Sequence, residues 1–270
     1  MKSTRLWWGG VGLAALLSTL LFMFGLIYAV NDIWNPAPSE PLKSAPEEAP
    51  GQASGDPLSR PEIRIVSLGD SLTKGTGDDT GQGYVGRVKK LLADRLDKPV
   101  YVINNLGVNG YVTKQLLDDL NTEPVQAALK KADVILLTIG GNDLFRLASD
   151  QLMQDTELDP KLIESRMPGP SARLTTLLRK LSALNPTATV VYVGLYNPFY
   201  ELDESKATND QIQKWNTAAF TTANRLPNVI VVPTFDLFQH KSASYLASDH
   251  FHPNAAGYDR IAQRIVQALE

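Results

Sequence analysis

Five short apolar runs divide the chain from residue 62 onward into repeats of a strand followed by a helix. The runs are rich in β-branched residues and do not clearly alternate apolar with polar positions, a pattern typical of strands buried on both faces of a parallel sheet. They are Ile63–Leu68, Val100–Ile103, Val134–Ile139, Val190–Leu195 and Val229–Val232. The sequence therefore predicts an α/β fold with about five parallel strands.

Apolar residues at helical spacing lie between and after these runs. The clearest sets span Val85–Leu96, Leu174–Leu184 and Tyr258–Leu269. Each set predicts an amphipathic helix that packs on the sheet. A further helix over about Ala207–Leu226 returns the chain to the last strand, whereas Phe145–Pro170 is less regular and is interpreted as an insertion or lid near the rim of the sheet.

The N-terminal part of the chain has a different pattern. Residues 1–5 carry Lys2 and Arg5, and residues 6–30 contain no charged side chain. An apolar run of this length spans a bilayer, whereas the apolar region of a signal peptide is usually about 7–15 residues long. We therefore expect an uncleaved transmembrane anchor over residues 6–30, with a cleaved signal peptide as the alternative. The positive-inside rule then places residues 1–5 in the cytoplasm and everything after residue 30 outside the cell membrane.

Residues 31–61 form a segment rich in Pro, Ala, Ser and Glu, which predicts a disordered linker. The folded domain is then expected over residues 62–270. Its chain contains no cysteine, which excludes disulfides, thiolate chemistry and cysteine-ligated zinc. A formal net charge of −3 without any long basic run argues against nucleic acid as the main partner.

Polar, glycine-containing segments follow the first three runs and precede the last helix. They are Gly69-Asp70-Ser71, Asn104–Gly110, Gly140-Gly141-Asn142-Asp143 and Ser248–Asn254. Ligands bind at the carboxyl ends of the strands in open α/β sheets, so we predict that Ser71 is a nucleophile. From its own surroundings alone, Ser71 has the alternative role of a helix cap. Glycine N–H groups and the amide of Asn142 are the donors that an oxyanion site requires.

Asp249 and His252 supply the base that a serine nucleophile needs. Their spacing allows the carboxylate to orient the imidazole on one tight turn, with Pro253 at the first position of the last helix. His250 is an alternative base, ranked lower because an adjacent side chain usually points elsewhere. His240 has no acidic partner at a comparable spacing and is interpreted as a solvated loop residue.

Two other kinds of site compete with a serine mechanism. Asp249, His250 and His252 have side chains of the types that bind zinc, but no H-E-x-x-H or comparable signature accompanies them. No nucleotide-binding fingerprint follows the first strand. We therefore expect neither a metal nor a cofactor. Asp70 and Asp143 are interpreted as braces that accept hydrogen bonds from loop N–H groups.

The four polar segments, taken in order, resemble the four sequence blocks of the SGNH (GDSL) hydrolase family. The resemblance covers about residues 63–270 and points to a membrane-anchored bacterial type. It implies a flavodoxin-like, three-layer α/β/α sandwich and a serine esterase or related acyl-transfer activity. It also implies that the family's Ser, Gly, Asn and His fall on Ser71, Gly110, Asn142 and His252.

Two positions of the blocks leave a choice open. Gly107 is a second candidate for the glycine of the second block, although the Asn-x-Gly pattern favours Gly110. His250 stands where the family often has a small residue, which concerns the local shape of the loop and the acyl selectivity.

The predicted function is hydrolysis of carboxylic esters, acyl or acetyl, through a triad of Ser71, His252 and Asp249. The expected substrate is a small-molecule, lipid or glycan ester outside the cell membrane. Two alternatives remain: an acyltransferase that acts on envelope glycans, and a non-catalytic anchored binding protein with the same fold.

Overall fold

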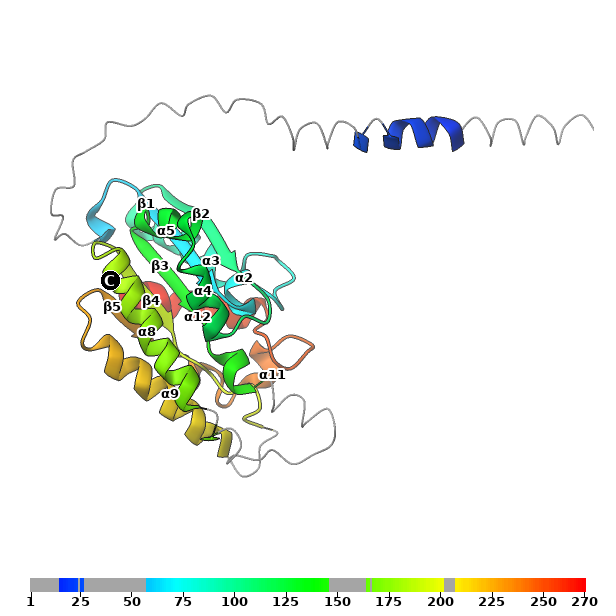
Figure 1. Ribbon diagram of the computed structural model, residues 1–270. Coiled ribbons are helices and arrows are strands. Elements are labelled where there is room, and N and C mark those ends of the chain that lie inside the picture. The colour runs from blue at the N-terminus through cyan, green and yellow to red at the C-terminus, as the bar shows by residue number, and fades with distance from the viewer. Residues whose placement is uncertain (1–14, 24, 27–56, 146–163, 166, 202–206) are drawn as a thin grey trace, which may run out of the picture. The chain divides into compact units, whose positions relative to one another are not determined.

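The computed structural model describes residues 15–23, 25–26, 57–145, 164–165, 167–201 and 207–270 (Figure 1). The chain divides into two compact units, Met1–Gln52 and Ala53–Glu270. The predicted cytoplasmic segment 1–5, much of the predicted anchor and residues 31–56 of the predicted linker lie outside the described residues. So do residues 146–163 and 166 of the predicted insertion.

A five-stranded parallel sheet forms the centre of the second unit. Its strands lie in the order β2-β1-β3-β4-β5. Their bounds are β1 Ile63–Gly69, β2 Val100–Gly107, β3 Val134–Thr138, β4 Thr189–Val193 and β5 Val229–Val232. The order in which strands are added changes direction between β1 and β3: β2 lies on one side of β1, and β3, β4 and β5 follow on the other. Ligands bind at such a switch point.

Helices follow each strand and cover both faces of the sheet (Figure 1). A short 3-10 helix, η1 (Pro57–Ser59), precedes β1. The labelled α-helices of this unit are α2 Ser71–Lys74, α3 Gly83–Leu96, α4 Thr113–Asp119, α5 Glu123–Lys130, α8 Pro168–Leu184, α9 Ala207–Ala223, α10 Phe235–Phe238, α11 Ser242–Tyr245 and α12 Ala255–Leu269, and residues 141–145 and 164–165 are also helical. The three-layer α/β/α architecture that we predicted is therefore confirmed.

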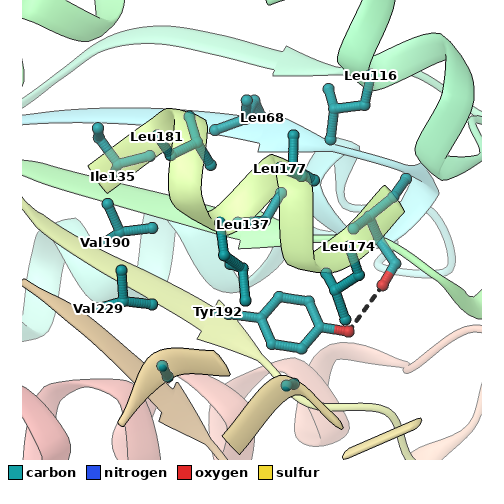
Figure 2. Packing of buried hydrophobic residues seen from close by; sticks show 14 of the residues in the cluster. Leu68, Leu116, Ile135, Leu137, Leu174, Leu177, Leu181, Val190, Tyr192 and Val229 are labelled. Atoms are coloured by element: carbon teal, nitrogen blue, oxygen red, sulfur yellow. Dashed lines mark hydrogen bonds between the residues drawn. The ribbon is translucent and has the colours of Figure 1, made fainter. Parts of the chain in front are cut away.

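The two faces of the sheet bury two separate apolar clusters. Val66 and Leu68 of β1 lie in the cluster under α4, α5, α8 and α9, and Ile63 and Ile65 lie in the cluster under α3 and α12. This alternation follows from the two-residue period of a strand. Figure 2 shows the first cluster, in which leucines of α8 pack on side chains of β3 and β4.

Strand β2 departs from the predicted pattern. We expected every strand to be buried on both faces, but most of β2 is exposed or half-buried. The reason is its position at the edge of the sheet, next to β1 alone. The strand is also longer than predicted, since it continues past Ile103 to Gly107. Its extension carries the second glycine-containing segment to the carboxyl end of the sheet, where Ser71 also lies.

The start of the last helix was also predicted wrongly. Helix α12 begins at Ala255 rather than at Pro253, because Asn254 is its N-cap and accepts a hydrogen bond from the Gly257 N–H at 3.0 Å. Pro253 instead forms an isolated antiparallel bridge with Leu246. This bridge closes the loop that carries Asp249 and His252.

The last residues of the predicted linker belong to the folded unit. Leu58 is buried in the cluster under α3 and α12, and the Arg60 guanidinium pairs with the buried carboxylate of Asp133. Asp133 also accepts hydrogen bonds from the backbone and side chain of Arg64. The chain is thus fixed to the domain a few residues before β1.

The described part of the N-terminal unit is helical at residues 15–23 and 25–26. Among the helices that the structure describes, none combines the length and apolar character needed to cross a bilayer.

Candidate active site

Ser71 lies directly after β1, at the first position of α2, in a segment that we call the serine turn (residues 69–75). Asp70 is the N-cap of this helix, and its Oδ1 accepts a hydrogen bond from the Leu72 N–H at 3.1 Å. The capping role that competed for Ser71 therefore belongs to its neighbour. The Ser71 Oγ lies 2.8 Å from His252 Nε2.

Close packing against β3 requires glycine at the start of the serine turn. Gly69 has a φ of +142°, and a Cβ built on it would lie 2.0 Å from the Thr138 carbonyl oxygen. Only glycine tolerates both the conformation and the contact. The Asp70 N–H donates to the same carbonyl at 3.1 Å, which holds the turn against the end of β3.

The hydroxyl of Thr138 connects both ends of the first turn of α2. It donates to Asp70 Oδ1 at 2.8 Å and accepts from the Thr73 N–H at 3.1 Å. Thr73 Oγ1 lies 2.6 Å from Thr138 Oγ1 and 2.9 Å from the Tyr84 hydroxyl. All four side chains are buried. Burial raises the pKa of the Asp70 carboxyl, and the hydrogen bonds from Thr138 and Leu72 offset only part of that rise.

Asp249 and His252 lie in the loop before α12, which we call the histidine loop (residues 246–254). Asp249 Oδ2 lies 2.6 Å from His252 Nδ1, and Asp249 Oδ1 accepts the backbone N–H groups of Phe251 and His252, both at 3.0 Å. Partial burial raises the pKa of Asp249, but these hydrogen bonds outweigh it and leave the pKa below its usual value. A carboxylate only accepts, so Nδ1 donates and Nε2 is left to accept from Ser71.

The histidine loop is closed by an internal hydrogen bond and held by two contacts from outside it. Within the loop, the Ala247 N–H donates to the His252 carbonyl at 2.8 Å. From outside, the Tyr196 hydroxyl donates to the Phe251 carbonyl at 2.7 Å, and Gly77 packs so closely that a Cβ on it would lie 2.8 Å from His252 Cβ. These contacts fix the backbone that carries the imidazole.

His250 adopts a left-handed backbone conformation, with a φ of +53°. That conformation is uncommon for a residue with a Cβ and easy for glycine. It explains physically why a small residue suits this position. His250 is exposed, and it is His252 that contacts both Asp249 and Ser71.

Asn142 follows β3 and has an ordered side-chain amide. Its Nδ2 donates to the Tyr111 carbonyl at 2.9 Å, which links Asn142 to the segment that carries Gly110. A side-chain amide carries two hydrogens, so the second can donate to a ligand. Asn142 and Ser71 line the same cleft. Asp143, the next residue, accepts hydrogen bonds from the Thr113 N–H and hydroxyl, as expected of a brace.

Gly107 and Gly110, the two candidates of the second block, have different surroundings. A Cβ on Gly107 would lie 2.5 Å from the Lys74 backbone nitrogen, and the Gly107 N–H donates to Asn105 Oδ1 at 3.0 Å. Gly110 has a φ of +77° and open space where a Cβ would be. Within the described ranges, the backbone N–H groups of Gly110 and Ser71 donate no hydrogen bond. Gly110 does not line the cleft itself.

The cleft beside Ser71 is small, with a volume of about 30 Å³. Four residues of its wall are polar: Ser71, Asn142, Asp70 and Thr138. The other wall residues are apolar or glycine. The apolar part consists of Leu72, Phe145, Val193, Leu195, Tyr196, Pro198 and Phe251.

Sequence reasoning missed Thr138, Phe145 and Phe251. Thr138 carried a signal, since it is a hydroxyl residue at the end of an otherwise apolar run. The two phenylalanines carried none beyond their closeness in sequence to Asn142 and His252. As for the metal site considered above, the described residues contain no cluster of three or more His, Asp or Glu side chains able to hold an ion.

Comparison with known proteins places these features in a family. The sequence profile of the GDSL-like Lipase/Acylhydrolase family matches residues 67–260. The protein YpmR of Bacillus subtilis is 36% identical over 224 residues, covering 81% of this chain and 86% of that protein. The spore germination lipase LipC of Bacillus licheniformis is 26% identical over 211 residues, covering 75% of this chain and 94% of that lipase.

Solved structures agree with this assignment. The lipase Lip_vut3 from a goat rumen metagenome is 26% identical, with a TM-score of 0.66 over 77% of this chain and 100% of that lipase. The acetylxylan esterase Axe2 of Geobacillus stearothermophilus shares the fold, with a TM-score of 0.58 at 20% identity over 77% of this chain and 94% of that esterase. The chain belongs to the GDSL-like lipase/acylhydrolase family and is an ester-cleaving hydrolase.

Proposed function

We propose that this protein hydrolyses carboxylic esters through a covalent acyl-enzyme on Ser71. The observation that carries the proposal is the continuous hydrogen-bonded chain from Ser71 Oγ to His252, at 2.8 Å, and from His252 to Asp249, at 2.6 Å. A serine hydroxyl is a weak nucleophile until an adjacent base accepts its proton. An imidazole held by a carboxylate supplies that base.

The reaction has two steps. In the first, His252 Nε2 accepts the Ser71 proton as Oγ bonds to the ester carbonyl carbon, and then gives the proton to the departing alcohol oxygen. In the second, Nε2 accepts a proton from a water that attacks the acyl-enzyme, and returns it to Ser71 Oγ as the carboxylic acid leaves. Asp249 keeps Nδ1 protonated and stabilises the imidazolium in both steps.

The negative charge on the carbonyl oxygen needs donors on the side away from the base. The Ser71 N–H lies at the start of α2, the Asn142 amide lines the same cleft, and the Gly110 N–H adjoins the residue that holds Asn142. We assign these three groups to the oxyanion site. Such donors stabilise the transition state because they are already oriented before the charge develops.

Replacement of Ser71 by alanine tests the nucleophile. Ser71→Ala is expected to lower kcat for p-nitrophenyl butyrate by about 10⁴-fold or more while leaving the circular dichroism spectrum and thermal unfolding unchanged. Retained turnover in Ser71→Ala would contradict the proposal. Wild-type protein that binds esters without hydrolysing them would instead favour the anchored binding protein considered above.

We further propose that residues 6–30 anchor the domain on the outer side of the cell membrane. Support comes from the uncharged run and from large apolar side chains that are more than half exposed in the described helical residues. These are Leu16, Leu17, Leu20, Leu21, Phe22, Met23 and Leu26. The full chain should sediment with membranes, and a Leu20→Lys, Leu21→Lys double variant should not. Sedimentation of both would contradict the anchor.

A further inference from the structure

We propose that two copies of this chain pair through the free edges of strand β2, so that their two sheets join into one across a two-fold axis at Tyr101. The inference concerns assembly and does not depend on the proposed function. The partner is a second copy of this chain.

Strand β2 presents apolar side chains at one end of the sheet, next to β1 alone (Figure 1). Tyr101 is 49% exposed and Ile103 is 36% exposed. The strand at the other end of the sheet, β5, has four residues, and none of them is exposed. An exposed, apolar edge strand is a template for pairing with another chain. The edge at which a partner strand fits is therefore β2.

The segment that contains β2 also lacks the charges that oppose pairing. No charged residue occurs from Pro99 to Thr113. Edge strands that stay unpaired commonly carry lysine or another charged side chain, which prevents contact with a second edge. Two identical copies of this segment approach each other without like-charge repulsion.

The backbone of β2 offers free hydrogen-bonding groups at Val100 and Val102. Ile63 of β1 pairs with Val100, and the Ile63 N–H donates to the Pro99 carbonyl at 3.0 Å. Successive residues of a strand direct their N–H and C=O groups to alternate sides, so Pro99 and Tyr101 face β1. The groups of Val100 and Val102 consequently point away from β1, toward a partner.

A two-fold axis at Tyr101 makes this edge complementary to itself. Identical strands related by such an axis run antiparallel, and each surface meets its own copy. Val100 of each copy then lies opposite Val102 of the other, and each of these pairs exchanges both of its N–H···O bonds. The two Tyr101 side chains form the non-hydrogen-bonded pair between them, where side chains are closest. Aromatic cross-strand pairs of this kind add stability.

The regular part of the edge is short. Pro99 has no N–H to donate. The register of β2 against β1 shifts after Val102, so that Asn104 pairs with Val66 and Ile103 is an extra residue. Such a bulge bends the strand and interrupts the ladder. The contact is thus confined to residues 99–103 and is smaller than the ~800 Å² per partner of a stable interface. We expect a weak dimer, with a Kd on the order of 10 μM.

The N-terminal part of the same chain is a poorer occupant of this edge. Residues 31–56 contain five prolines and a single β-branched residue, Ile33. Proline cannot donate to a ladder, and strands are rich in β-branched residues. A second copy of β2 supplies both the donors and the apolar side chains that this segment lacks.

Antiparallel pairing leaves both catalytic sites open. Ser71 follows the carboxyl end of β1, and the carboxyl ends of the two joined sheets point in opposite directions. Formation of the dimer should therefore leave kcat per chain unchanged.

The first experiment tests the register by disulfide crosslinking of the full chain in detergent micelles. The sequence has no cysteine, so one introduced cysteine reports one contact. In Tyr101→Cys the paired Cα atoms should be about 4.5 Å apart, within the range of about 4.4–6.8 Å that a disulfide requires. In Ile103→Cys they should be about 13 Å apart, because four positions separate them along the joined strands.

Mild oxidation should therefore crosslink Tyr101→Cys into a dimer and leave Ile103→Cys largely monomeric on non-reducing gels. Equal crosslinking of both variants, or none in Tyr101→Cys, would overturn the proposed register.

The second experiment measures the dimer of the full chain by sedimentation equilibrium in the same micelles. Tyr101→Lys places two like charges opposite each other and should raise Kd at least about tenfold, whereas Tyr101→Phe should stay within about threefold of the wild type. Phe220→Lys is the matched control, since Phe220 is an exposed apolar residue of α9, which packs beside β5. Its Kd should equal that of the wild type.

A wild type that stays monomeric well above 10 μM would overturn the inference. So would an unchanged Kd in Tyr101→Lys, which would place the contact elsewhere on the chain. Tyr101→Lys should keep kcat for p-nitrophenyl butyrate within about twofold of the wild type. Absence of ester hydrolysis by the wild type would contradict the proposed function and leave the dimer intact.

Discussion

Ser71 and His252 are brought together from two regions with different surroundings. The serine turn continues a central strand, and its contacts are buried: Thr138 joins Asp70 to Thr73, and Gly69 packs on the end of β3. The histidine loop lies at the surface, and the Asp249 side chain is 45% exposed. It is held by a short bridge, a few backbone hydrogen bonds and the close approach of Gly77.

The two regions therefore contribute differently: the buried contacts of the serine turn stabilise the fold, whereas the contacts of the histidine loop orient the imidazole. Loss of the buried hydrogen bonds among Asp70, Thr73 and Thr138 leaves polar groups without partners, so it should lower both stability and activity. Changes in the histidine loop remove contacts near water, so they should lower activity with little effect on folding. Substitutions in each region test whether stability and activity can be lost separately.

The largest effect is expected in the histidine loop. His252→Ala should lower kcat for p-nitrophenyl butyrate by about 10⁴-fold or more, because Ser71 then has no base. The melting temperature should stay close to that of the wild type, which thermal unfolding measures.

His250→Gly is the matched control in the same loop. It should keep kcat/KM within about twofold of the wild type, because glycine readily adopts the φ of +53° found at this position. A loss comparable to that of His252→Ala would show that His250 is the base and would contradict the assignment.

Removal of an oxyanion donor should have the next largest effect. Asn142→Ala should lower kcat by about 10²–10³-fold with a much smaller change in KM, because the donor acts mainly in the transition state. Steady-state kinetics measure both constants. A rise in KM at unchanged kcat would instead make Asn142 a binding residue.

Thr138→Val tests the buried hydrogen bonds that hold the serine turn. It removes one hydroxyl without changing the shape of the side chain. The Thr73 N–H then loses its partner, and Asp70 Oδ1 keeps only the hydrogen bond from the Leu72 N–H. We expect a loss of about 1–3 kcal/mol of stability and about tenfold in kcat. Thr138→Ser should restore most of both. Unaltered stability in Thr138→Val, measured by urea unfolding, would show that the serine turn does not depend on this hydroxyl.

The smallest effect on activity is expected in the segment that follows the serine turn. Asp78 accepts the N–H groups of Thr80 and Gly83 and pairs with Arg87. Although burial raises its pKa, these contacts lower it to about 2. A folded-state pKa below the unfolded value of about 3.9 contributes about 2 kcal/mol of stability above pH 4, and this contribution is lost as the pH falls toward 2.

Asp78→Asn should remove this dependence. The variant should be less stable than the wild type at pH 7, and the difference should shrink between about pH 4 and pH 2. Urea unfolding at a series of pH values measures it. A difference that stays constant down to pH 2 would mean that the Asp78 carboxylate does not carry the effect.

Much of the fold could be predicted because it depends on local patterns. The β-branched runs and helical spacings identify four of the strands nearly to their ends and the four long helices α3, α8, α9 and α12. The exposed edge strand β2 was misjudged, since its position at the edge depends on strand order rather than on its own residues. The short helices α4, α5, α10 and α11 escaped notice because each presents too few apolar residues for a clear period.

In the candidate site, too, local sequence identifies some residues but not the contacts that depend on the tertiary structure. Ser71, Asn142, Asp249 and His252 stand in short blocks whose residue types by themselves indicate their chemistry. The link between Thr138 and Asp70 depends on the register of β1 against β3, which pairs Gly69 with Thr138. The meeting of Phe145, Phe199 and Phe251 depends on three segments that are distant in sequence. No local pattern encodes such contacts.

The activation of Ser71 by His252 is tested most directly by covalent labelling of the full chain with a fluorophosphonate, measured by intact-protein and peptide mass spectrometry. Such a reagent reacts with a serine whose hydroxyl is activated by a neighbouring base. We predict one adduct per chain, located on Ser71, that forms far more slowly in His252→Ala and at the wild-type rate in His250→Gly. An adduct on another residue, or labelling of Ser71 at the same rate in His252→Ala, would show that His252 does not activate Ser71 as a nucleophile.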